Sequence, residues 1–101
     1  MSPTIKIPII RLVIVQYAWN IKVSDRKSFE EFINLLLVDF NKNKDNEDEW
    51  ENNRLDLFLE AMSRYTKDID GYYQNMEPDQ NADVPSWKVF ADIMRGAVVY
   101  E

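Results

Sequence analysis

The chain of 101 residues contains no cysteine and no histidine, and it has only two glycines. Without cysteine there is no disulfide bond and no thiolate metal site. Without histidine the chain lacks the commonest general base, the commonest metal ligand and the usual pH switch. Two glycines are too few for a glycine-rich phosphate-binding loop. These absences exclude Ser-His-Asp and Cys-His hydrolases and leave chemistry by carboxylates alone as the enzymatic option.

The acidic residues do not follow a catalytic or metal-binding pattern. A calcium loop needs a glycine at its sharp turn, and in the cluster from Asp45 to Glu51 that place is taken by Trp50. Asp56 and Glu60 lie one helical turn apart, but glycoside hydrolysis needs two carboxylates in a concave site with different pKa values. A solvated helix face explains this pair better. We therefore expect no bound metal, no cofactor and no enzymatic activity.

The charge of the chain is acidic and unevenly distributed. Residues 1–44 carry seven basic and four acidic side chains, whereas residues 45–101 carry five basic and fourteen acidic ones, a net charge of −9. Such a surface repels nucleic acid and lipid headgroups and attracts basic proteins. We therefore expect a protein partner with a basic surface, and neither nucleic acid nor membrane. The alternative is that the charge serves solubility alone.

The N-terminal segment is apolar and rich in β-branched residues. Its run from Ile9 to Trp19 is shorter than a membrane span, which needs about 20 residues, and no signal-peptide cleavage site follows. Together with the lack of cysteine, this fits a cytoplasmic protein. Residues 4–23 suit a strand with two apolar faces, which both need cover. The partner strand is residues 21–23, residues 98–100 or the same strand of a second chain, so a homodimer is one option.

Three later segments have the apolar spacing of amphipathic helices. The first starts at Ser28, which with Glu31 fits a capping box, and it ends in the polar residues 41–46. The second runs over about residues 53–69, and Gly71 is expected to break it. The chain has 46% hydrophobic residues, which is enough to form the one hydrophobic core of a single domain of this length.

A loop with two prolines over residues 71–85 precedes the third helix, which starts near Pro85 or Ser86. We predict a mainly α fold, in which residues 1–22 form an N-terminal strand segment and residues 23–101 form a three-helix bundle-like domain. The fold is α+β if the strand pairs. The predicted core residues are Phe32, Ile33, Leu36, Phe40, Leu55, Phe58, Leu59, Met62, Trp87, Phe90 and Met94.

A tryptophan stands among the acidic residues between the first two helices. Tryptophan is enriched at binding hot spots, so Trp50 is a candidate for partner contact. The alternative is that its ring caps the core, with its N–H bonded locally. The predicted partner-binding residues are Glu49, Trp50, Glu51, Asp56 and Glu60.

Two stretches carry a resemblance to known sequences. They are Trp50-Glu51-Asn52 followed by Leu55-x-x-Phe58-Leu59-Glu60-Ala61-Met62, and Trp87-x-x-Phe90-Ala91 followed by Tyr100-Glu101. This pattern resembles a small uncharacterised bacterial family, a domain of unknown function of about this size. The resemblance covers roughly residues 23–101, and the N-terminal segment departs from it. Some small families of this kind lie beside toxin and immunity genes.

The order of a strand, a Ser-capped helix, a loop and a Leu-Asp helix is also similar to barstar, the ribonuclease inhibitor. This similarity implies that Asp56 and Glu60 match acids that occupy a nuclease active site. We therefore predict a small acidic protein-binding module, most concretely an immunity or inhibitor protein that covers a basic site on a toxin or nuclease. The alternative is a structural homodimer paired through its N-terminal strand.

Overall fold

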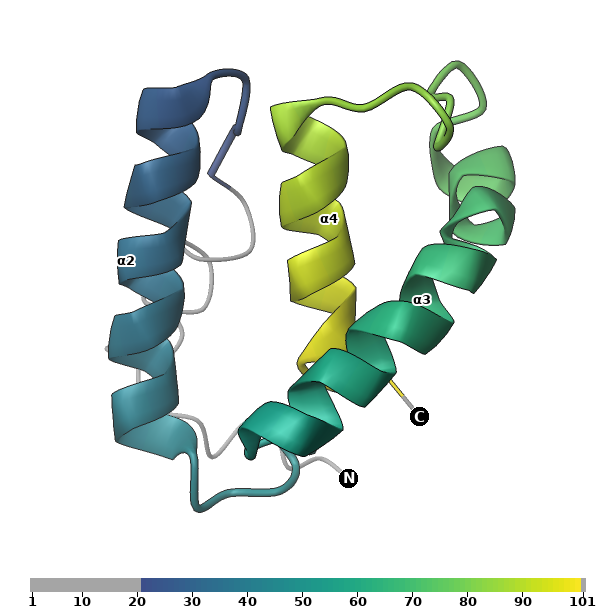
Figure 1. Ribbon diagram of the computed structural model, residues 1–101. Helices are drawn as coiled ribbons and strands as arrows, with labels where there is room; N and C mark the ends of the chain where they lie inside the picture. Colours follow the sequence, from purple (N-terminus) through teal and green to yellow (C-terminus); the bar gives the residue numbers. More distant parts are fainter. Residues whose placement is uncertain (1–20, 101) are drawn as a thin grey trace.

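The computed structural model describes residues 21–100, which fold into three helices joined by two loops (Figure 1). Helix α2 spans Arg26–Asn43, α3 spans Leu55–Met76 and α4 spans Trp87–Ala97. Helix α4 lies between the other two and packs against both, whereas α2 and α3 diverge from the loop that joins them. The prediction of a mainly helical, three-helix fold is confirmed. The described residues contain no strand, and the predicted strand before residue 21 lies outside them.

Helix α2 begins earlier than the sequence pattern predicts. Asp25 is its N-cap, and the Asp25 carboxylate accepts a hydrogen bond from the Ser28 backbone N–H at 2.8 Å. The Ser28 hydroxyl accepts in return from the Asp25 backbone N–H at 3.1 Å. This is a capping box with Ser28 in its third position, so the prediction of Ser28 as the cap paired with Glu31 is wrong. Donation from the Ser28 hydroxyl and backbone amide lowers the pKa of Asp25 below 3.8.

Helix α3 continues through Gly71 and ends at Met76, so the predicted break at Gly71 is wrong. Tyr73 follows Ile69 by one turn, and both side chains are only 1% exposed, which extends the buried stripe past the glycine. Pro78 stands two residues beyond Met76, where a helix cannot continue. The loop predicted over residues 71–85 is therefore correct only from residue 77 onwards.

Helix α4 begins where the sequence predicts. Ser86 is its N-cap, and the Ser86 hydroxyl accepts from the Val89 backbone N–H at 3.1 Å. Residues 98–100, one of the three options for a partner strand, do not form a strand, because Val98 keeps helical backbone angles of −55° and −42° and lies in a turn. Val98 is fully buried, so this turn closes the core.

Two apolar clusters hold the helices together. The larger one joins α2, the α2–α3 loop and α4; its buried members are Val23, Phe32, Leu36, Trp50, Ala91 and Val98. The smaller one joins the second half of α3 to α4 and contains Ile69, Tyr73 and Val89. Among the predicted core residues, the partly buried ones packed on the larger cluster are Ile33, Phe40, Phe58 and Met94. Four others are exposed, in contrast to the prediction: Leu55, Leu59, Trp87 and Phe90.

Candidate functional site

The predicted partner-binding residues lie in the α2–α3 loop and the first turns of α3. Glu51, Asp56 and Glu60 are exposed, and Glu49 is half-buried. From residue 45 to residue 60 the chain carries seven acidic side chains and a single basic one, Arg54. We call residues 45–60 the acidic segment. Its charge is almost entirely of one sign.

Trp50 belongs to the core and not to the outer surface. It is 4% exposed, its indole N–H donates to the Asp39 carboxylate at 2.9 Å, and its ring meets the Phe40 ring edge-on at 4.9 Å. Asp39 is itself 1% exposed and also accepts from the Asn43 amide at 3.0 Å. Of the two interpretations of Trp50, the one in which it caps the core therefore describes the structure. The Trp50 side chain therefore anchors the acidic segment to the core.

Asn52 is a second anchor, which the sequence analysis missed. Its side-chain amide donates to the carbonyl oxygens of Ala97 at 2.7 Å and Tyr100 at 2.9 Å, and its backbone N–H donates to the Val98 carbonyl at 3.0 Å. These bonds satisfy carbonyl groups that the end of a helix leaves unpaired. Trp50 and Asn52 are buried while Glu51 between them is exposed. The Trp-Glu-Asn motif thus fixes an outward-pointing carboxylate between two buried side chains.

Two carboxylates of the acidic segment already have an arginine partner. Both oxygens of Asp56 accept from the Arg54 guanidinium, at 3.0 and 2.8 Å, and this contact lowers the pKa of Asp56. Glu60 lies 3.3 Å from Arg64. All four side chains are exposed, Arg64 less than the other three, and exposed ion pairs contribute little stability. A basic side chain of a partner would therefore displace either arginine at little cost.

An apolar groove of about 340 Å³ opens beside the acidic segment, between α2 and the start of α3. Leu37 and Leu55 line it although they are 55% and 74% exposed. The other apolar lining residues are Ile33, Leu36, Phe40, Trp50, Phe58 and Met94. Polar side chains contribute at one end of the groove, from residues 52–54. Several of the predicted core residues thus form an open surface, because α2 and α3 diverge there (Figure 1).

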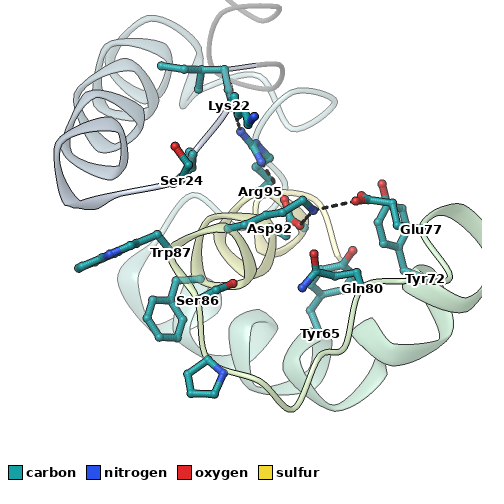
Figure 2. Close-up of a pocket in the computed structure, with 16 residues that line it drawn as sticks. Lys22, Ser24, Tyr65, Tyr72, Glu77, Gln80, Ser86, Trp87, Asp92 and Arg95 are labelled. Carbon is teal, nitrogen blue, oxygen red and sulfur yellow. Dashed lines mark hydrogen bonds and ion pairs between the residues drawn. The ribbon is translucent and has the colours of Figure 1, made fainter.

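A second cavity, of about 1010 Å³, lies between residues 21–24, the second half of α3 and α4 (Figure 2). Asp92 is the centre of its polar wall and accepts from Lys88 at 2.7 Å, Arg95 at 2.8 Å and the Tyr73 hydroxyl at 2.7 Å. Lys88 also pairs with Glu77 at 2.9 Å. The charged groups named here are therefore bound to one another and hold α4 to α3.

The same contacts set the protonation of this wall. Burial raises the pKa of the Tyr73 hydroxyl, and its hydrogen bond to Asp92 raises it further. Burial lowers the pKa of Lys88, but the hydrogen bonds to Asp92 and Glu77 outweigh it and raise that pKa above 10.5. Tyr73 stays neutral and Lys88 stays charged near neutral pH. Neither of these two groups therefore titrates near pH 7.

Among residues 21–100, no three carboxylates gather in a way that would hold a metal ion. None of the three helices is long and apolar enough to cross a membrane.

These features define a small three-helix domain with an anchored acidic segment beside an apolar groove. The chain belongs to a family of unknown function, DUF7660, whose family model matches residues 25–101. The predicted resemblance to an uncharacterised domain family is thereby confirmed. None of the curated proteins and none of the solved structures matches the chain. The match begins at Asp25, the N-cap of α2, so it contains all three helices and both anchors of the acidic segment.

Proposed function

We propose that this chain is a cytoplasmic protein-binding module that uses its acidic segment to bind a basic surface of a partner protein. Most concretely, it is an immunity or inhibitor protein that covers a basic site on a toxin or nuclease. The observation that supports this most is the anchoring of the segment. The segment that carries seven acidic side chains and one basic one is anchored to the core through Trp50 and Asn52. A surface that is already ordered loses less entropy when it binds.

The charge of the segment also suits fast and selective association. Complementary charge raises the rate of encounter and rejects partners of the same sign, and this effect weakens as salt screens it. The exposed pairs of Asp56 with Arg54 and of Glu60 with Arg64 exchange readily for contacts with a partner's lysine or arginine. Binding through this segment should therefore be strongest at low ionic strength.

Charge reversal at two exposed pairs of carboxylates tests the proposal. Glu51→Lys with Glu60→Lys changes the acidic segment, and Asp79→Lys with Asp83→Lys makes the same change of charge in the α3–α4 loop. Asp56 is left intact because it lies in the first turn of α3, where an acid favours the helix. The measurement is the affinity of each variant for the protein encoded by the adjacent gene, at about 50 and about 300 mM salt.

We expect the first pair of substitutions to weaken binding by about tenfold or more and to flatten its salt dependence, and the second pair to have an effect below about threefold. Equal effects of the two pairs would show that only the overall charge matters. The charge would then serve solubility, and the proposal would be wrong.

The second proposal is a structural homodimer paired through the N-terminal strand. The residues predicted to form that strand lie outside the described ones, so nothing in the three helices bears on this proposal. Light scattering of the full chain and of a chain that starts at Val23 tests it. A monomer in both cases rejects the homodimer.

A further inference from the structure

We infer that the apolar groove between α2 and α3 binds an amphipathic helix of the partner, with apolar side chains in the groove and basic side chains over the acidic segment. This inference rests on the proposed function and specifies the kind of partner. Its starting point is the exposure of apolar side chains. Leu37, Leu55 and Leu59 are 55%, 74% and 54% exposed.

The position of these leucines matters more than their number. A single exposed leucine is ordinary in a soluble protein, but Leu37 of α2 and Leu55 of α3 line the same groove, together with Met94 of α4. Leu59 follows Leu55 by one helical turn and so lies on the same side of α3. A contiguous exposed apolar surface with a polar border is typical of a binding site. Covering it would remove several large side chains from water, at roughly 25 cal/mol per Å².

The shape and chemistry of the groove favour a helix over an extended peptide. Ile33, Leu37 and Phe40 stand at positions i, i+4 and i+7 of α2, so this wall is about 10 Å long. Helices that dock in grooves use anchors of this same spacing. An extended peptide would carry unpaired backbone N–H and C=O groups into an apolar lining, which is costly, whereas a helix pairs them internally. The polar lining is confined to residues 52–54.

Charge decides between a different protein and a second copy of this chain. The acidic segment contributes its only basic residue, Arg54, and the apolar Trp50, Leu55 and Phe58 to the lining of the groove, while its acidic side chains lie outside the lining. Two copies docked through this face would bring together two segments that each carry seven acidic side chains and one basic one. Like charges at an interface cost free energy, whereas lysine or arginine beside the apolar anchors is complementary. The occupant is therefore a basic amphipathic helix of another protein.

A designed peptide tests the inference on the intact chain. The probe is a synthetic helical peptide of about 18 residues with leucine on one face and lysine on the other. One control peptide has the same composition with the leucines spread around the helix, and another has glutamate in place of lysine. Binding is measured by fluorescence anisotropy. We expect the probe to bind at least about tenfold more tightly than either control peptide.

Substitutions in the chain locate the binding site. Leu37→Ser and Leu55→Ser change exposed residues of the groove, and we expect each to weaken probe binding by about fivefold or more. Val38→Ser and Val84→Ser are matched controls, since these residues are 45% and 55% exposed and do not line the groove. We expect effects below about twofold for both controls.

The possible results separate this inference from the proposed function. If Glu51→Lys with Glu60→Lys weakens binding of the natural partner but Leu37→Ser does not, the acidic segment binds and the groove inference is wrong. If Leu37→Ser weakens binding of the natural partner but the two charge reversals do not, the groove binds the partner and the acidic segment does not. Equal binding of the scrambled peptide, or no binding of the probe, overturns the inference. Self-association of the chain that Leu37→Ser abolishes would also overturn it, because the occupant would then be a second copy.

Discussion

The buried carboxylate of Asp39 explains how a tryptophan comes to lie in the middle of a charged loop. Asp39 is 1% exposed, and a carboxylate at that depth is tolerated only with hydrogen-bond partners. Trp50 donates to one of its oxygens and Asn43 to the other. The polar contact between Asp39 and Trp50 joins two segments that are eleven residues apart. It therefore fixes the position of the acidic segment.

Trp50→Phe should destabilise the fold by about 1–3 kcal/mol, because it removes the donor to a buried charged group while it keeps an aromatic ring in place. Trp87→Phe is the matched control. Trp87 is 37% exposed and its ring lies 5.3 Å from the Phe29 ring in a tilted arrangement, so we expect an effect below about 1 kcal/mol. The measurement is the free energy of unfolding in urea. Equal losses in the two variants would show that the Asp39 contact is unimportant.

At the scale of the helix, capping residues and apolar spacing predicted where most helices start. They failed where two signals in the sequence disagreed. Asp25-x-x-Ser28 and Ser28-x-x-Glu31 both fit a capping box, and a single sequence does not show which of them the chain uses. Gly71 suggested a helix end, but the spacing of Ile69 and Tyr73 already indicated continuation. The buried stripe of α3 prevailed because its burial outweighs the cost of one glycine, about 1 kcal/mol.

The exposure of Leu55 and Leu59 shows where sequence patterns stop being informative. Their spacing correctly predicted one face of a helix, and α3 forms over them. Whether that face meets a neighbour depends on the angle between α2 and α3, which is a non-local property. The apolar groove therefore could not be predicted from the sequence, whereas the acidic segment beside it could be read directly from composition.

The two glycines lie inside helices, and they should respond to alanine in opposite directions. A methyl group on Gly71 would meet nothing within 4 Å, so Gly71→Ala should stabilise the fold by about 0.5–1 kcal/mol. A methyl group on Gly96 would overlap the ring of Tyr65. Gly96→Ala should therefore destabilise the fold by about 1–3 kcal/mol despite the same gain in helix propensity.

Urea unfolding measures both effects. Combining Gly96→Ala with Tyr65→Leu should recover part of the loss, because the smaller side chain makes room for the methyl group. If alanine stabilises at both positions, α3 and α4 are not in close contact at Gly96.

At the scale of the whole molecule, the two cavities differ in what remains available to a ligand. In the larger one, Lys88 and Arg95 are already paired with Asp92 within α4. The Tyr73 hydroxyl bonds to Asp92, and Glu77 pairs with Lys88, so these contacts hold α4 to α3. The apolar groove combines exposed leucines with lining residues from a segment whose net charge is negative. The groove and the acidic segment are therefore the surface that we assign to partner binding.

The most direct test of this binding surface is an NMR titration of the isotope-labelled full chain with the basic amphipathic peptide. We expect the amide signals that shift to cluster in residues 33–40 of α2 and residues 49–60, on both sides of the groove. The signals of the α3–α4 loop, residues 77–86, should stay in place. Shifts concentrated around Lys88, Asp92 and Arg95, or spread evenly over the three helices, would contradict binding through the acidic segment and its groove.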